Sequence, residues 1–227
     1  MTRTHPGNGQ ELNESRRNVC VRSAVAGDVP RIVKIHQRAF NSSFLTRLGA
    51  KFLKHYYGLV LNYHYGIVLV SERSGALEGF ACGFLDPAEF YRLMWRNRWT
   101  FAPIALLALV RQPALAMDVF NGIQRVQQSA SQHTVRSCEL SSIAIAPEAS
   151  GKGSGKALLQ AFIARAWSMD AERVYLNTDA NDNDQANALY QRVGFHCTHR
   201  FLQSRRRWMN EYVIDESCQR SFEYAAK

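Results

Sequence analysis

A glycine-rich hexad, Gly151-Lys152-Gly153-Ser154-Gly155-Lys156, sets the strongest constraint on how this chain can fold. It directly follows a hydrophobic, strand-like run at 135–146 and directly precedes an apolar helical pattern at 154–167. Three alternate glycines let backbone N–H groups converge on an anion, and the dipole of the following helix adds partial positive charge at the same point. The pattern predicts a phosphate-binding loop; a glycine-rich turn without a ligand is the other interpretation.

Two common nucleotide-binding loops do not fit the residues around the hexad. A triphosphate-binding loop that ended at Gly155 and Lys156 would need glycine at position 150 and serine or threonine at position 157, where the chain has Ser150 and Ala157. A dinucleotide-binding fingerprint that began at Gly151 would place its third glycine at Lys156, and it would lie near the first strand of its domain. Both classes are therefore disfavoured.

Hydrophobic periodicity predicts a chain in which strands and helices are mixed. The elements expected before the hexad are a strand from Val19, a helix capped by Asp28 and running to Phe40, helical rhythm over 44–63, and antiparallel strands at 66–71 and 77–85. A stretch at 86–132, called the insertion below, is expected to hold two or three helices interrupted at Pro103 and Pro113. The elements expected after the hexad are the helix at 154–167, a strand at 173–177, a helix at about 182–193 stopped by Gly194, and a hairpin at 195–214. A mixed α/β sheet flanked by helices follows from this order.

Two motifs in the C-terminal half resemble the GNAT superfamily of acyl-CoA-dependent N-acetyltransferases. The first is Glu139-Leu-Ser-Ser-Ile-Ala-Ile-Ala-Pro147 followed by 150–159, which is similar to the acetyl-CoA-binding core of that family. The second matches the family pattern Asn-x-x-Ala-x-x-Leu-Tyr-x-x-x-Gly-Phe without a gap, at Asn183, Ala186, Leu189, Tyr190, Gly194 and Phe195. The resemblance implies a central, mostly antiparallel sheet with two splayed strands. It covers roughly 19–85 and 135–214, and the insertion lies outside it. We expect one domain at 19–214 that carries the insertion, with a disordered tail at 1–18 and a C-terminal tail at 215–227.

The resemblance also implies a cosubstrate, acetyl-CoA, and no metal. Its diphosphate is expected on the hexad, with backbone donors from Gly151, Gly153, Ser154, Gly155 and Lys156, and with charge from Lys152 and Lys156. Pantetheine is expected in the opening between the splayed strands, paired with the backbone of Ile143, Ala144 and Ile145 in the manner of an added strand. Asn183 is expected either to contact pantetheine or to begin the helix that follows it. Ser150 departs from the family, which usually has glutamine or arginine at that position.

Acetyl transfer needs an amine that has lost its proton, although a simple alkyl amine has a pKa of about 10. By resemblance, Glu139 is the expected general base, acting directly or through water, and Tyr190 is the expected proton donor to the departing thiolate. A backbone N–H near Ala144 to Ala146 is expected to stabilise the developing oxyanion. The other interpretations are a Glu139 that serves only solubility or an ion pair, and a Tyr190 that packs in the core.

The sequence thus predicts an N-acetyltransferase in which an amine attacks acetyl-CoA directly in a ternary complex. A non-catalytic CoA-binding regulator or scaffold with the same fold is the alternative. A binder of membrane surfaces or nucleic acid, through the apolar run Trp99 to Val110 or through Arg205 to Arg207, is weaker, because the chain lacks a dense basic cluster or a known binding module. We expect no nucleic-acid partner and no transmembrane segment, and the oligomeric state, with a homodimer as one possibility, is open.

Charge and cysteine content bear on the partner and the compartment. The formal charge of +9 and pI near 9.6 favour a polyanionic partner such as a phosphate-rich cosubstrate. The acceptor is expected to be a small amine, such as an amino sugar or a nucleotide-linked amine, rather than a protein. The insertion is expected to roof its site, with candidate lining residues Tyr91, Trp95, Trp99 and Phe101 and candidate anion ligands Arg92, Arg96, Arg98 and Arg111. Five scattered cysteines without Cys-x-x-Cys spacing favour a reducing, cytoplasmic location.

Overall fold

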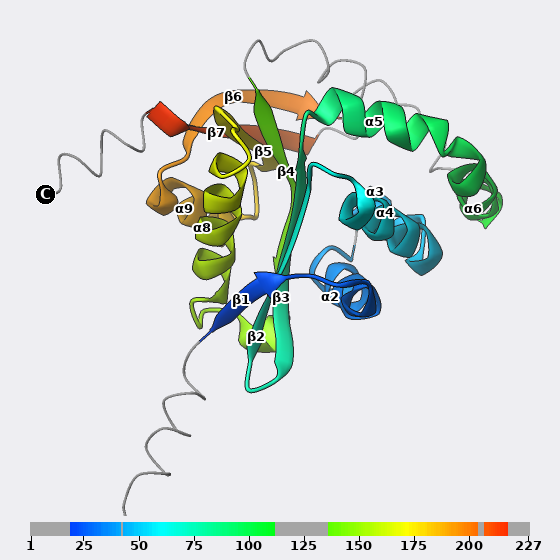
Figure 1. The fold of residues 1–227 in the computed structure, drawn as a ribbon, viewed down its shortest axis with the longest axis horizontal. Coiled ribbons are helices and arrows are strands. Elements are labelled where there is room, and N and C mark those ends of the chain that lie inside the picture. Colours follow the sequence, from blue (N-terminus) through cyan, green and yellow to red (C-terminus); the bar gives the residue numbers. More distant parts are fainter. Residues whose placement is uncertain (1–18, 42, 112–135, 204–206, 218–227) are drawn as a thin grey trace, which may run out of the picture.

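The computed structural model describes residues 19–41, 43–111, 136–203 and 207–217. Within these ranges one seven-stranded sheet has the order β1-β2-β3-β4-β5-β7-β6, and every neighbouring pair is antiparallel except β4 with β5, which is parallel (Figure 1). The strands are β1 (Cys20–Ser23), β2 (Gly66–Arg73), β3 (Ala76–Leu85), β4 (Ser137–Ile145), β5 (Arg173–Asp179), β6 (His196–Gln203) and β7 (Arg207–Asp215). This mostly antiparallel sheet confirms the predicted fold class.

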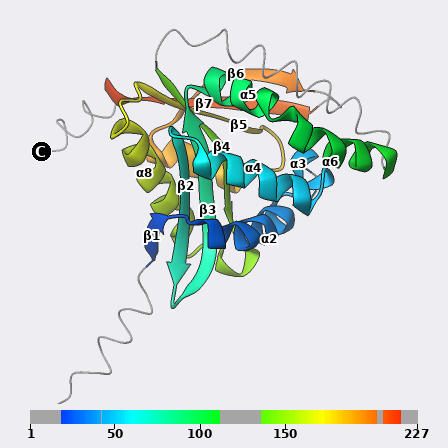
Figure 2. The same cartoon turned by 45° about the vertical axis from the view of Figure 1, so that its right-hand side comes forward.

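Helices cover both faces of the sheet, as the turned view in Figure 2 makes clear. One face carries α2 (Val29–Ala39), α3 (Phe44–Arg47), α4 (Ala50–Asn62), α5 (Pro87–Arg96) and α6 (Arg98–Arg111). The other face carries α8 (Ser154–Trp167) and α9 (Asp184–Val193). Short 3-10 turns, η1 (Ala26–Asp28) and η2 (Pro147–Ala149), connect the elements. The described part of the insertion, α5 and α6, therefore lies on the same side as the N-terminal helices.

The sheet separates two hydrophobic cores, and strand β2 shows how its sequence supplies both. Val68 and Val70 pack with α2 and α4, whereas Ile67 and Leu69 pack with α8. Successive side chains of a strand point to opposite faces, so a continuous apolar run is what a strand covered on both faces requires.

A β-bulge at Ser141 reverses this alternation in β4. Cys82 pairs with Ser142 and Gly83 pairs with Leu140, which leaves Ser141 without an opposite residue on β3. Cys138 and Leu140 therefore face the α8 core, and Glu139 faces the helices α4 and α5. A Cβ at Gly83 would lie 2.1 Å from the Glu139 carbonyl oxygen, so only glycine permits this approach of the two strands.

Several expected elements have different limits in the structure. The predicted helical stretch at 44–63 is two helices, because Gly49 takes a φ of 93° that ends α3 before α4 begins. Pro103 does not interrupt its helix; it lies inside α6, which tolerates one missing N–H. Asp28 precedes α2 but makes no cap bond to it, since its carboxylate accepts from Arg22 and from the Val25 N–H. Val135 and Pro113 lie outside the described residues.

Candidate active site

The parallel strands β4 and β5 pair over a short length only. Their register runs from Ser137 with Arg173 to Glu139 with Tyr175, while β4 continues to Ile145 and β5 continues to Asp179. On its other edge β4 stays paired with β3 as far as Ile145 opposite Gly79. The backbone of Ile143 to Ile145 therefore has one edge turned toward an opening between the two strands, and Glu139 lies where the opening begins.

The Glu139 carboxylate is held by two tyrosine hydroxyls from separate elements. Tyr91 on α5 donates to Oε1 and Oε2 at 3.0 and 3.1 Å, and Tyr175 on β5 donates to Oε2 at 3.0 Å. The pKa of each tyrosine is raised, first by burial and then by the Glu139 charge, so both remain donors. Charge-assisted hydrogen bonds of this kind fix the position of a carboxylate.

Glu139 is half-buried, and buried polar groups lie beside it. Next to it at the bulge, the Tyr56 hydroxyl and the Ser141 hydroxyl are 2.6 Å apart. Two fully buried thiols, Cys82 and Cys138, lie on the adjoining strand positions, and their pKa values are raised, first by burial and then by the Glu139 charge. A thiol with a raised pKa is a poor nucleophile at neutral pH.

Tyr190 lies on the opposite face of the sheet from Glu139. It is 6% exposed on α9, and its ring lies 6.1 Å from the ring of Phe195 and 5.6 Å from that of Tyr212. Burial raises its pKa to about 12, an effect that a hydrogen bond with Thr178 partly offsets. Glu139 and Tyr190 therefore lie on opposite faces of the sheet, in different cores.

The hexad forms the loop that leads into α8. Gly151 and Gly153 have φ angles of 76° and 90°, in the left-handed region that favours glycine, and Gly153 is the residue just before the helix. Ser154, Gly155 and Lys156 form the first turn of α8, where backbone N–H groups have no acceptor earlier in the helix. This geometry fits an anion at the helix N-terminus.

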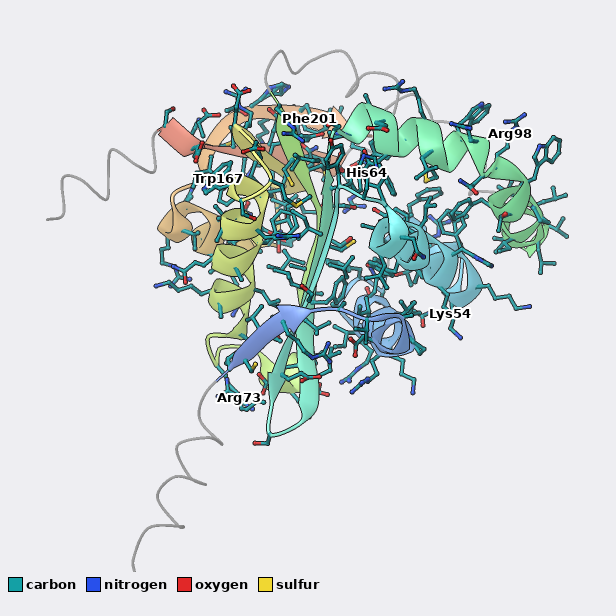
Figure 3. All side chains as sticks on the ribbon, viewed as in Figure 1. Lys54, His64, Arg73, Arg98, Trp167 and Phe201 are labelled. Carbon is teal, nitrogen blue, oxygen red and sulfur yellow. The ribbon has the colours of Figure 1, made fainter. Side chains whose placement is uncertain are left out.

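Side chains from the β2–β3 hairpin brace this loop. The buried Ser154 hydroxyl donates to Glu78 at 2.6 Å, and Glu78 in turn accepts from Arg73 at 2.9 Å. Arg73 also donates to the Lys152 carbonyl at 3.1 Å, and Figure 3 shows it beside the start of α8. Ser154 and Glu78 are 76 residues apart in sequence, and Arg73 and Lys152 are 79 apart, so no local pattern predicts these two contacts.

The remaining predicted cosubstrate residues occupy different positions. Lys152 and Lys156 are exposed, and Lys152 donates back to the Glu148 carbonyl at 2.8 Å. Asn183 stands directly before α9 but makes no side-chain cap bond; its amide donates to Thr178 at 2.7 Å. The Ala146 N–H, one of the expected oxyanion donors, is taken by the Glu78 carbonyl at 2.7 Å.

The insertion contributes one of its four candidate aromatic residues to the site. Tyr91 contacts Glu139, whereas Phe101 packs against Phe52 with ring centroids 5.2 Å apart, and Trp95 and Trp99 are exposed. Sequence reasoning missed Tyr175, Tyr56 and Ser141, since their roles depend on strand register and on the bulge. Within the described ranges, no group of three or more His, Cys, Asp or Glu is placed to hold a metal ion.

Known structures with the same fold cover most of the chain. A putative acetyltransferase from Salmonella typhimurium, yncA, with its cofactor acetyl-CoA, has 16% identity and a TM-score of 0.58 over 87% of this chain and 94% of its own. An N-acetyltransferase from Staphylococcus aureus Mu50 has 18% identity and a TM-score of 0.57 over 87% and 98%. A polyamine N-acetyltransferase from Drosophila melanogaster has 13% identity and a TM-score of 0.55 over 87% and 100%. No curated protein matches the chain.

The model of the acetyltransferase (GNAT) family matches residues 29–195. This range includes the Glu139 strand, the hexad and the motif from Asn183 to Phe195, so the resemblance found in the sequence is confirmed. The chain belongs to the GNAT family of acetyltransferases.

Proposed function

We propose that the chain transfers the acetyl group of acetyl-CoA to a primary amine on a small molecule. The observation that carries this proposal is the coincidence, on one strand, of the carboxylate of Glu139 and an open backbone edge at Ile143 to Ile145, followed at once by the glycine loop of α8. A thioester held along that edge, with its phosphates on the loop, would have its acyl end directed toward Glu139. The loop, with φ angles that only glycine readily adopts, fits a diphosphate closely approached by backbone.

Each candidate side chain has a distinct task in this proposal. Glu139, fixed by Tyr91 and Tyr175, accepts the proton of the amine directly or through a water molecule. Acetyl-CoA supplies the acyl group as a thioester with a good leaving group. Tyr190 stabilises the thiolate that forms. Its pKa of about 12 lies well above the value of about 8.5 for an alkyl thiol, so its main contribution is a hydrogen bond rather than full proton transfer.

Direct attack in a ternary complex is favoured over an acyl-enzyme intermediate. The two thiols nearest Glu139, Cys82 and Cys138, are fully buried and their pKa values are raised, so neither is an activated nucleophile. The amine must then meet the thioester without a covalent relay through the protein.

The charge on the acceptor side supports an anionic amine such as a phospho-sugar or a nucleotide-linked amino sugar. The helices α2 to α6, which cover the side of the sheet that Glu139 faces, include ten Lys or Arg and one acidic residue, Glu89, so this side has a net positive charge. Polyamines, the acceptors named for the Drosophila neighbour, carry several positive charges that this side would repel. An amine that also bears phosphate would be attracted.

Thiol release from acetyl-CoA by the purified protein tests the proposal. We expect release with an amino sugar phosphate well above release with spermidine, and mass spectrometry should find the acetylated amine. Calorimetry with CoA and acetyl-CoA provides the control for the cosubstrate. Binding without turnover on any amine would leave the scaffold alternative in place, and no heat with either ligand would overturn both.

A further inference from the structure

Helix α6 exposes a largely apolar face. The exposed apolar positions recur at helical spacing along one side: Trp99, Ala102, Pro103, Leu106, Leu107 and Val110, called the outer face below. The exposed polar residues Arg98 and Thr100 lie in the first turn of the helix. Trp99, Leu106 and Val110 are 76%, 63% and 72% exposed. The opposite side of α6, with the buried Phe101, packs against the core beneath α4. A helix that is apolar on both sides is normally covered on both sides, so the outer face calls for a partner.

The rim of the outer face is basic and aromatic. Arg92, Arg96 and Arg98 are exposed next to it, and the Arg98 guanidinium lies 5.6 Å and 5.2 Å from the ring centres of Trp95 and Trp99. On the neighbouring α4, Lys51 and Lys54 are exposed as well. Figure 3 shows Lys54 and Arg98 pointing outward from the helical side of the sheet.

We propose that the outer face of α6 docks on the surface of an anionic lipid bilayer. Tryptophan and leucine side chains bury readily at the boundary of headgroups and acyl chains, and arginines beside them meet the negative surface potential. With 14 residues α6 is shorter than the roughly 20 that a spanning helix needs. None of the helices in the described ranges is long and apolar enough to cross a membrane. The helix would therefore lie in the plane of the surface.

The charge pattern favours lipid over other occupants. A second copy docked on the same face would bring two basic rims together. Their like charges would repel each other, and salt would only reduce this repulsion. Nucleic acid would be attracted by the arginines but gains little from contact with the apolar outer face. An anionic bilayer offers negative charge at the rim and hydrocarbon at the centre, which matches both parts of this surface.

Vesicle co-sedimentation at physiological salt tests the proposal independently of catalysis. The probes are vesicles of phosphatidylcholine alone and of phosphatidylcholine with about 30% phosphatidylglycerol. We expect the wild-type chain to bind the anionic vesicles at least ~10-fold more strongly than the neutral ones. The double variant L106S/L107S should lose this binding at least ~10-fold, because it removes two buried side chains from the contact. The matched control is Leu202→Ser, which changes an equally exposed leucine, 54% exposed, on β6 and should bind as the wild type does.

Three results would overturn the proposal. The first is no preference for anionic vesicles, and the second is binding that survives in L106S/L107S. The third is a loss of self-association or of thermal stability in L106S/L107S without vesicles, which would mean that a second copy or the chain itself covers the outer face. Thiol release with a soluble amine should stay unchanged in L106S/L107S, so a failure of the proposed enzymatic function is seen separately.

Discussion

The two sides of the sheet form their candidate binding sites from different chemical groups. The side with α8 and α9 is called the cosubstrate half below, and the side with α2 to α6 the acceptor half. On the α8 and α9 side, the candidate cosubstrate site consists of main-chain features: the free edge of β4, the left-handed glycines 151 and 153, and a helix N-terminus. On the α2 to α6 side, the candidate acceptor site consists of side chains: the Glu139 carboxylate and the tyrosines around it.

Charge divides the halves in the same way. The helices α2 to α6 have ten basic residues and one acidic residue, whereas 137–217 has nine basic and ten acidic residues. The excess of positive charge therefore lies mainly in the helices on the side that would meet the acceptor, and not in the segment that would hold CoA. Main-chain recognition suits a cosubstrate of fixed shape, while side-chain recognition can be changed for each acceptor.

Among the substitutions in the acceptor half, Glu139→Gln should lower the catalytic rate most. Glu139→Gln keeps the size of the side chain but removes the base, so kcat with the amine should fall about 10²- to 10⁴-fold. Steady-state kinetics checks this, with CoA affinity by calorimetry and the thermal midpoint as controls that should stay unchanged. A rate within about twofold of the wild type would remove Glu139 from the mechanism.

Acid should weaken the core of the acceptor half through His36. This histidine is 2% exposed, its Nδ1 lies 2.6 Å from the Tyr57 hydroxyl, and burial lowers its pKa to about 4 from an ordinary 6.5. The unfolded chain binds this proton at higher pH than the folded one. Stability is therefore complete above pH 6.5 and falls between pH 6.5 and 4, by about 3 kcal/mol if no other group compensates.

Urea unfolding at pH 7 and pH 4.5 measures this loss, and His36→Gln provides the comparison. The variant cannot take up the proton, so its stability should change less between the two pH values than that of the wild type. An equal change in both proteins would show that other groups cause the acid sensitivity.

The cosubstrate half was readable from sequence because its features are local. The hexad alone indicated a loop and a helix start, and Gly194 indicated the end of α9, where it takes a φ of 109°. The mixed sheet followed from the order of short patterns. Each of these inferences depends on residues within one turn or one strand of each other.

In the acceptor half the sequence named Glu139 and Tyr91 as candidates but not the contacts between them, because those contacts join distant segments. Tyr175 meets Glu139 only through the parallel register of β4 with β5, and Tyr91 comes from a helix 48 residues earlier. The bulge that turns Glu139 toward α5 had one sequence signal, Gly83 within a strand pattern. Pro103 gave a misleading signal, since the packing of α6 on α4 outweighs one lost hydrogen bond.

A test of phosphate binding in the cosubstrate half compares two glycines that both have a positive φ but lie in different loops. Gly153→Ala puts a Cβ on a residue with a φ of 90° in the candidate loop, which costs about 1–3 kcal/mol and should weaken CoA binding about tenfold. Gly75→Ala does the same at a φ of 78° in the β2–β3 turn and should leave CoA affinity unchanged. Calorimetry on both variants decides the matter, and equal affinities for CoA would argue against phosphate binding at this loop.

Substitution of Tyr190, also in the cosubstrate half, should lower kcat by a smaller factor. Tyr190→Phe removes a hydrogen bond to the departing sulfur but keeps the ring in its core, so kcat should fall about tenfold while KM for the amine stays the same. The thermal midpoint should fall only slightly, through the loss of the hydrogen bond with Thr178, worth about 1 kcal/mol. A loss of stability with normal kcat would assign Tyr190 to packing alone.

Tyr91→Phe has the smallest expected effect on kcat, and it tests whether the insertion contributes to the active site. Tyr91→Phe leaves Glu139 with the Tyr175 hydroxyl as a remaining donor, so kcat should fall only about fivefold, equivalent to about 1 kcal/mol. Tyr63→Phe is the matched control, since Tyr63 lies in the same aromatic cluster but donates to Glu89 at 3.2 Å. If both variants lose activity equally, Tyr91 acts through packing of the cluster. If only Tyr91→Phe does, α5 helps to hold the catalytic carboxylate, and the acceptor half is then defined by the insertion as well as by the sheet.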